Sequence, residues 1–247
     1  MEKTQSVGEI MNFVVFDIWA DYAQFKKPFT TMSPQTFSIP TGTAIVGLIS
    51  AIVGLDKNEY WKYFPEGSFQ MAVGVREVVK KVVIPINTLK TTSPKHFYRF
   101  EQHKQTTMEF IKDGKFRVWF AWDDVEHFLQ LVANLKNHES YYTVSLGLAW
   151  NIADFKYVGL FEGKSSERKN DFIEICSTIP KRLIGENEEI DFENRKIFIN
   201  NIPVRMKSDN SRIVEHYDEY LFDSDGNGIR AKMGNVLKVG GEYIIPL

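Results

Sequence analysis

The chain has 247 residues, a mass of 28.6 kDa and a formal net charge of −2 at pH 7. Its 43% hydrophobic and 25% charged content is ordinary for a globular protein that can bury a real core. The longest uncharged apolar stretch, residues 39–55, is too short and glycine-rich to span a membrane, and the polar first residues indicate no secretory leader. A single cysteine, Cys176, excludes an internal disulfide and suits a reducing compartment, so we expect a cytoplasmic protein without membrane contact.

Two elements are predicted near the start of the chain. An apolar run over residues 13–19 predicts a strand. Residues 43–55 carry no charge and predict a helix that follows Pro40, with Thr41 or Thr43 as its N-cap.

Glycines interrupt this helix in a way that needs an explanation. Gly42, Gly47 and Gly54 each lower helix propensity by about 1 kcal/mol relative to alanine, which a chain tolerates where bare backbone is needed. We expect Gly42 and Thr43 to present backbone amides to a phosphate, because a helix start is a natural anion site. A valine at Gly42 is then expected to impair ligand binding, and one at Gly47 to destabilise the fold by overpacking.

The later elements complete an alternating pattern. Strands are predicted over residues 69–84 and 116–122, an amphipathic helix over 123–136 capped by Asp123 or Asp124, and a fourth strand over 157–161 or 142–148. The succession βαββαβ predicts an α+β fold of the ferredoxin-like or RRM type, here over residues 1–165. Residues 85–114 form an insertion that is too long for an ordinary hairpin loop. Residues 166–247 predict a small β-rich C-terminal extension.

Charge is segregated along the chain. Between Arg76 and Arg117 there are ten basic and four acidic residues, a balance of +6, so the remainder carries −8 of the total of −2. This distribution indicates a polyanion-binding face on an otherwise acidic body. A solvated basic hairpin without a partner is the alternative interpretation of the same charges.

The order of the motifs is more specific than any one of them. The first strand is followed by Phe-Lys-Lys at residues 25–27, a polar loop, and the pattern Pro-x-x-Thr-Ala-Ile-x-Gly-Leu-Ile-x-Ala-Ile-x-Gly from Pro40. Residues 99–120 and 141–149 add two further stretches. Together they resemble the fifth CRISPR-associated (Cas) protein family of the RAMP superfamily of RNA-binding proteins, most closely its Hmari or type I-B branch. The resemblance covers residues 10–165.

The resemblance implies a role in RNA-guided defence. Members of this branch are non-catalytic subunits of a Cascade surveillance complex that cap the 5′ handle of the CRISPR RNA (crRNA). Such a subunit contacts the Cascade backbone subunit and the large subunit, and it meets target DNA only through the complex. No cofactor is implied.

The insertion carries the residue types that single-stranded RNA requires. Cations track phosphates while aromatic rings stack on unpaired bases, and both kinds of residue interleave between Lys90 and Lys104. The resemblance makes this segment a thumb-like β-hairpin, at about residues 85–114, that grips the handle. The predicted RNA contacts are Lys26, Lys27, Gly42, Thr43, Arg76, Lys90, Lys95, His96, Tyr98, Arg99, His103 and Lys104.

Two other functions remain open from the sequence. Lys95 and His96 resemble the Lys-His pair with which the type I-C branch cleaves CRISPR repeats, and Tyr22 is a candidate third member. A histidine that moves the 2′-hydroxyl proton and a lysine that stabilises the phosphate would make a metal-independent endoribonuclease. The second alternative is a ferredoxin-like module that binds protein and no RNA.

No metal site is predicted. Residues 223–228 imitate the first half of an EF-hand loop, but position twelve of that loop is Gly234 instead of the required glutamate. Clusters of Asp, Asn and Gly build tight turns more often than metal sites. The five histidines show no zinc-ligand spacing.

Overall fold

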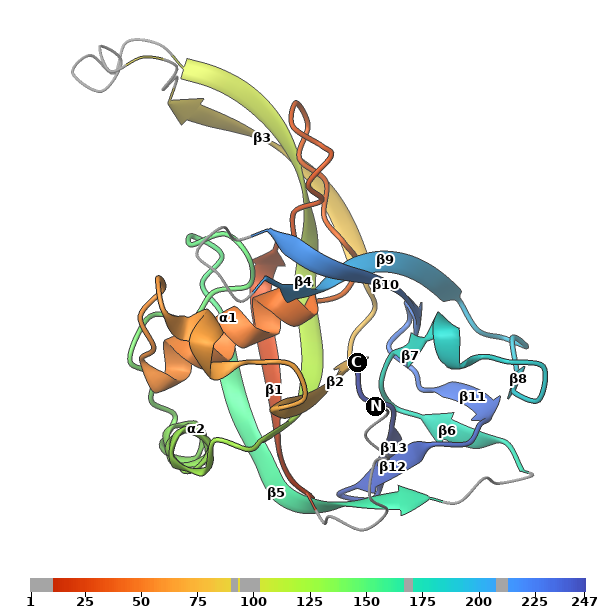
Figure 1. Cartoon of the computed structure of the whole chain (residues 1–247). Helices are drawn as coiled ribbons and strands as arrows, with labels where there is room; N and C mark the ends of the chain where they lie inside the picture. The colour runs from red at the N-terminus through yellow and green to blue at the C-terminus, as the bar shows by residue number, and fades with distance from the viewer. Residues whose placement is uncertain (1–10, 90–92, 94–102, 167–170, 208–212) are drawn as a thin grey trace.

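The computed structural model describes residues 11–89, 93, 103–166, 171–207 and 213–247. Its first part consists of β1 (Met11–Ala23), α1 (Gly42–Val53), the 3-10 turn η1 (Tyr60–Tyr63), β2 (Phe69–Val75), β3 (Lys80–Leu89), β4 (His103–Trp122), α2 (Val125–Asn137) and β5 (Asp154–Ser166). The predicted succession of strands and helices is present, with β3 as an additional strand. The fold is mixed α/β, with few helices and a curled sheet (Figure 1).

The rest of the chain is built from short strands. These are β6 (Ile173–Ile175), β7 (Ile179–Pro180), β8 (Glu189–Ile190), β9 (Ile197–Met206), β10 (Val214–Asp223), β11 (Ile229–Lys232), β12 (Val236–Val239) and β13 (Glu242–Ile244), with the 3-10 turn η3 (Lys181–Leu183) after β7. This part is β-rich, as the sequence predicts.

Two sheets organise these strands. The larger runs β2-β4-β1-β5-β12-β13-β6-β11-β8, and β3 pairs with β4 beside it. The smaller runs β7-β10-β9. In β1, Val14, Phe16 and Ile18 belong to the core on the helix side, and Phe13 and Val15 to a cluster on the other face. A strand covered on both faces reads as a continuous apolar run, which explains the sequence of β1.

The helices begin and end at chemically suitable residues. The Thr41 hydroxyl accepts a hydrogen bond from the Ala44 amide at 3.1 Å, and Gly54 ends α1 in the left-handed region with φ of +96°. Asp124 caps α2 by accepting from the His127 amide at 3.2 Å. None of the helices among the described residues is both long and apolar enough to cross a membrane.

The predicted strand at residues 69–84 is two strands. The chain turns between Val75 and Lys80, where the Arg76 amide donates to the Lys115 carbonyl and the Val79 amide to the Ser224 carbonyl. Both strands then pair with different halves of β4, which is much longer than the predicted 116–122. The predicted alternative strand at 142–148 is a loop, and β5 supplies the fourth strand.

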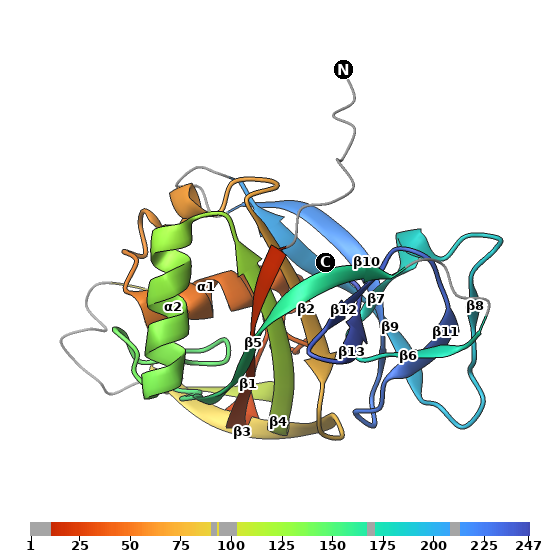
Figure 2. The same ribbon diagram turned by 90° about the horizontal axis from the view of Figure 1, so that it is seen from below.

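The C-terminal strands complete the core that the first part begins. Ile202 of β9 and Tyr220 and Phe222 of β10 are buried with α1, α2 and the helix-side face of the large sheet. Figure 2 shows α1 and α2 on one side of β1 and the short strands β6, β8 and β11–β13 on the other, and β9 packs against α1. The division expected at residue 165 falls inside β5, which pairs with β12, so the two parts share a sheet and a core.

Candidate nucleic-acid interface

A two-stranded hairpin projects from the body of the protein. β3 pairs with residues 103–112 of β4 in a regular antiparallel register from Lys80 opposite Lys112 to Leu89 opposite His103. We call this pair of segments the hairpin arm; Figure 1 shows it leaving the molecule on the side of α1 and β9. His103 and Lys104 are exposed on it. Lys90, Lys95, His96, Tyr98 and Arg99 lie outside the described residues.

Charges on the described arm are mostly basic. The described arm has four basic residues and one acidic residue, a net charge of +3; these are Lys80, Lys81, Lys104, Lys112 and Glu109. The Lys81 ammonium makes contacts within the protein: it donates to the Thr36 carbonyl at 3.0 Å and to the Glu109 carboxylate at 3.2 Å. Lys80, Lys104 and Lys112 are exposed and remain as candidate phosphate contacts.

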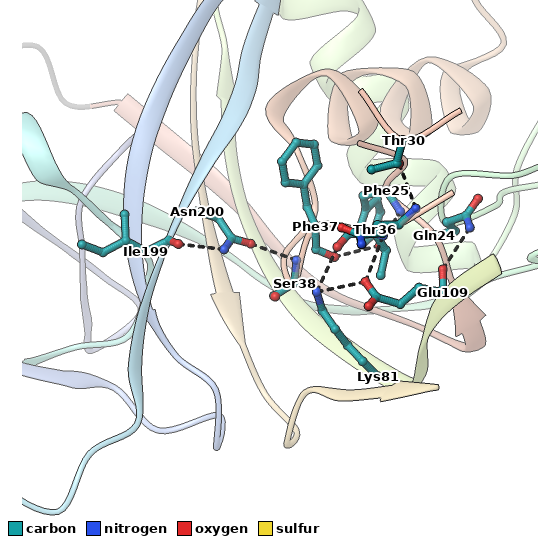
Figure 3. Close-up of polar contacts among 11 residues, drawn as sticks. Gln24, Phe25, Thr30, Thr36, Phe37, Ser38, Lys81, Glu109, Ile199 and Asn200 are labelled. Carbon is teal, nitrogen blue, oxygen red and sulfur yellow. Dashed lines mark hydrogen bonds and ion pairs between the residues drawn. The ribbon is translucent and has the colours of Figure 1, made fainter. Parts of the chain in front are cut away.

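The segment from residue 24 to 38 is fastened to the base of the arm (Figure 3). Glu109 is the centre of this attachment: its carboxylate accepts from the Thr36 amide at 3.1 Å, and its carbonyl accepts from the Gln24 side chain at 2.9 Å. The Thr36 hydroxyl in turn accepts from the Phe25 amide at 2.9 Å. Gln24 and Thr36 are buried, so these bonds fix the backbone around Lys26.

The same segment is joined to β9. The Ser38 amide donates to the Asn200 side chain at 3.0 Å, and Asn200 donates to the carbonyl of its neighbour Ile199 at 2.8 Å (Figure 3). Residues 24–38 therefore connect the arm to the β9–β10 hairpin, two parts of the molecule that are far apart in sequence.

Lys26 lies in a groove at the start of α1. The groove has a volume of about 300 Å³ and includes Thr41, Thr43 and Ala44 of the helix start. Its other side is made by the loop at Gly147 and by Tyr217 of β10. We call it the Lys26 groove. The first turn of α1 contains no acidic residue, so the positive end of the helix dipole and an exposed lysine face the same space. Lys26 and Thr43, both predicted RNA contacts, therefore line the same groove.

Lys27 differs from its neighbour. It is half-buried, and its ammonium lies 6.0 Å from the centre of the Phe37 ring. It does not line the Lys26 groove among the described residues. Of the lysine pair, Lys26 is therefore the one that the structure brings to the helix start.

Gly42 has a different role from the predicted one. It is buried, and a Cβ on it would stand 2.6 Å from the Val204 carbonyl oxygen of β9. The glycine thus lets α1 approach β9 closely, and its Cα faces the Val204 backbone. A Cβ on Gly47 would have no neighbour within 4 Å, so the expected overpacking there is wrong as well. Thr43, whose hydroxyl is 3.0 Å from that of Thr41, does line the Lys26 groove.

Arg76 belongs to a partly buried ion cluster and not to the arm surface. Its guanidinium bonds Glu242 at 2.6 Å and lies 5.4 Å from the Trp119 ring centre. Arg117 donates to both oxygens of Asp17, at 2.7 and 3.0 Å, and to Glu242 at 3.0 Å. The hydrogen bond to Asp17 raises the pKa of Arg117 above its usual range despite the opposing effect of burial. Arg76 and Arg117 therefore hold the end of β2, β4 and β13 together. Arg76 was predicted to contact RNA, and the structure instead pairs it with Glu242 inside the protein.

Tyr22 lies at the base of the arm. It is opposite Lys112 in the β1–β4 pairing, and its ring meets Phe110 edge-on with a centre distance of 6.1 Å. His103 is nine positions from Lys112 along β4, about 30 Å at the usual rise of a strand. Lys95 and His96 lie outside the described residues, so the set of Tyr22, Lys95 and His96 stays a prediction.

The described residues contain no group of three or more His, Cys, Asp or Glu side chains that could hold a metal ion. The imitation of an EF-hand at residues 223–228 is a turn, in which the Asp223 carboxylate accepts from the Asp225 amide at 2.7 Å. Asp225 pairs with Lys196 at 3.0 Å.

Sequence reasoning missed the residues that later strands and loops bring to this region. Gly147, Leu148 and Tyr217 line the Lys26 groove, and Trp150 lies beside Tyr22 in a second groove. Trp150 is 59% exposed, and the apolar sequence around it, Leu146-Gly-Leu-Ala-Trp150, gives no signal of that exposure.

Comparison with known proteins gives the family. A sequence model of the family described as CRISPR-associated protein (Cas_Cas5) matches residues 13–196, which is most of the chain. The chain therefore belongs to the Cas5 family of CRISPR-associated proteins. No match was found among functionally curated proteins.

The solved structures that match the chain are distant in sequence. A CRISPR protein from Archaeoglobus fulgidus is 14% identical, with a TM-score of 0.47 over 95% of this chain and 97% of that one. A chain of a CRISPR RNA-guided surveillance complex is 12% identical, with a TM-score of 0.49 over 95% and 91%. A chain of a type III-B Cmr-beta complex bound to cognate target RNA is 9% identical, with a TM-score of 0.46 over 87% and 86%.

Proposed function

We propose that this protein is a non-catalytic RNA-binding subunit of a type I CRISPR Cascade complex, of the I-B branch, and that it caps the 5′ handle of the crRNA. The family supports a place in CRISPR defence. The finer role rests on the interface described above and on the resemblance of the motifs to that branch.

One observation carries the proposal. The hairpin arm, with exposed Lys80, Lys104 and Lys112, and the Lys26 groove at the start of α1 are joined by one hydrogen-bonded segment, residues 24–38. Cations at several points along a rigid surface are what a flexible polyanion needs in order to be held in one path.

We also propose that the first part of the chain is an RRM-like domain. Its strands lie in the order β5-β1-β4-β2 and are antiparallel, and α1 and α2 connect them as in the βαββαβ unit. β3 and the first half of β4 are then an elaboration of the hairpin between the second and third strands of that unit.

As a Cascade subunit the protein would contact the backbone subunit and the large subunit, and it would meet target DNA through the complex. It would act in the cytoplasm, where guide RNA is made and loaded. Cleavage of the repeat would fall to a separate endoribonuclease.

Binding of a labelled single-stranded RNA with the 5′ handle of the host's CRISPR repeat tests the proposal. A triple variant, Lys26→Ala, Lys104→Ala and Lys112→Ala, should weaken binding and lower the slope of log affinity against log salt by about 2, at roughly 0.7 per lost phosphate contact. The matched control replaces Lys181, Lys196 and Lys232, which pair with acids away from the arm. Equal binding by both triple variants, or an affinity that does not respond to salt, would refute the proposal.

A further inference from the structure

A second groove lies at the base of the hairpin arm. Its volume is about 270 Å³, and its apolar lining is Tyr22, Ile84, Ile86, Phe110, Trp150 and Ile152. Two of these side chains present rings to solvent: Trp150 is 59% and Tyr22 is 40% exposed. We call it the Trp150 groove. Soluble surfaces seldom expose two aromatic rings beside further aliphatic side chains without a use for them.

Trp150 is held on a rigid turn. The Leu146 amide bonds the Asn151 carbonyl at 2.9 Å, the Asn151 amide bonds the Leu148 carbonyl at 2.9 Å, and the Gln24 amide bonds the Leu146 carbonyl at 3.0 Å. Gly147 permits this attachment, because it has φ of +94° and its missing Cβ would overlap the Gln24 carbonyl oxygen. A ring on such a turn loses little conformational freedom when it binds a ligand.

Cations border the Trp150 groove on the same face of the sheet. Tyr22 is opposite Lys112 on β4, and Lys112 is opposite Lys80 on β3. Residues directly opposite each other in antiparallel strands project to the same face, so exposed Lys112 is the direct cross-strand neighbour of Tyr22, and exposed Lys80 lies one strand further along the same row. The groove therefore combines exposed rings with neighbouring positive charge, which complements an unpaired nucleotide and not an apolar peptide.

The turn around Trp150 also connects this groove to the Lys26 groove. Gly147 and Leu148 line the Lys26 groove, whereas Trp150 and Ile152 line the other. A single strand that places a phosphate near Lys26 can thus cross one short turn to reach the Trp150 ring.

We propose that the Trp150 groove receives an unpaired base of the bound RNA, stacked on Trp150 with Tyr22 beside it. The inference rests on the proposed function and adds a base-binding site to it. The volume is slightly below the range of pockets for drug-sized ligands, which suits one planar ring system. Asp21, the neighbour of Tyr22 in β1, also lines the groove.

The test distinguishes binding of the RNA bases from binding of the phosphate backbone. The full-length protein is titrated with a fluorescein-labelled 12-nucleotide oligoadenylate RNA and with an abasic ribose-phosphate oligomer of the same length. Trp150→Ala should lower affinity for oligoadenylate by roughly 5- to 150-fold, the range expected for one stacked base, and leave affinity for the abasic oligomer unchanged. Lys112→Ala should weaken both. Phe192→Ala, at an equally exposed ring near β8, is the matched control and should change neither.

The outcomes distinguish this inference from the proposed function. If Trp150→Ala and Phe192→Ala bind oligoadenylate equally while the lysine variants are weakened, the base site is refuted and the RNA-binding role stands. If none of the variants changes binding, both are refuted. If Trp150→Ala loses a co-purifying protein subunit but keeps its RNA affinity, the base site is also refuted. The Trp150 groove would then bind a protein partner. Thermal unfolding should be the same for all variants at exposed rings.

Discussion

Gly42 of α1 lies directly against Val204 of β9, with room for a hydrogen but not for a methyl group: a Cβ on Gly42 would stand 2.6 Å from the Val204 carbonyl oxygen. This contact joins the helix start to a strand that comes more than 150 residues later, and it keeps Thr43 at the wall of the Lys26 groove. The glycine is therefore required by packing.

Alanine substitutions at two glycines of α1 should have opposite effects. Gly42→Ala should destabilise the fold by about 1–3 kcal/mol, because a backbone carbonyl must move to accept the new methyl group. Gly47→Ala should stabilise it by about 0.5–1 kcal/mol, because the site is open and alanine favours the helix. Urea unfolding of both variants measures the difference. Equal stability of Gly42→Ala and the parent would show that the helix can move away from β9.

The ion cluster of Asp17, Arg117, Arg76 and Glu242 predicts that the stability of the fold depends strongly on Asp17. Its side chain is 12% exposed and accepts two bonds from Arg117. Asp17→Ala should cost about 3 kcal/mol of stability, because it leaves a largely buried guanidinium with half of its partners. Replacing Asp225, whose side chain is 30% exposed and pairs with the 68% exposed Lys196, should cost less than about 1 kcal/mol and serves as the control. Similar losses of stability at both positions would mean that the ion cluster stabilises the fold no more than a surface ion pair does.

Stability should fall in alkaline solution for a specific reason. Burial raises the pKa of the Cys176 thiol and of the Tyr220 phenol. Both groups are neutral when protonated, so the folded chain keeps protons that the unfolded chain releases, and stability declines as the pH rises past their usual values of about 8.5 and 10. Urea unfolding at pH 7.5 and pH 10 should show the decline, and the double variant Cys176→Ala, Tyr220→Phe should reduce it. An identical decline in the double variant would assign the effect to other groups.

The endoribonuclease alternative is open to a direct experiment. Purified protein incubated with its repeat RNA in EDTA should leave the RNA whole. The variants His96→Ala and Tyr22→Phe should behave as the parent does. Specific cleavage by the parent that disappears in His96→Ala would overturn the non-catalytic assignment and make Lys95 and His96 an active site.

The local features of the sequence predicted the local structure well. Thr41 and Asp124 cap the two helices, and Gly54 ends α1, all within a few residues of the expected positions. Each of these signals acts over one turn of helix, so the sequence alone contains it.

The break between β2 and β3 depends on contacts that no local pattern shows. Val78 and Val79 continue the apolar run of β2, so the sequence predicts one strand to residue 84. The turn is held instead by Ser224, which accepts from the Val79 amide, and by Glu242, which binds Arg76. The same long-range ion cluster explains why Arg76 was predicted to bind RNA, since charge counting cannot distinguish a paired arginine from a free one.

The candidate site was predicted in part for a similar reason. Lys26 follows β1 and Thr43 lies in the first turn of α1, so one loop separates the two residues and the sequence alone could suggest a common site. Trp150 and Tyr217 come from a turn and from a late strand, and a single aromatic residue in either has no periodicity that marks it.

Pro85 protects the open edge of the hairpin arm against pairing with another chain. Within the described part of the chain, β3 is paired with β4 on one side and offers its other edge to solvent. Such an edge is a template on which another chain can add a strand and begin aggregation. Pro85 stands in the middle of β3 and has no amide hydrogen to donate, and Lys80 and Lys81 place like charges at its start. Two copies of the protein at high concentration are thereby discouraged from joining arm to arm before either has met its ligand.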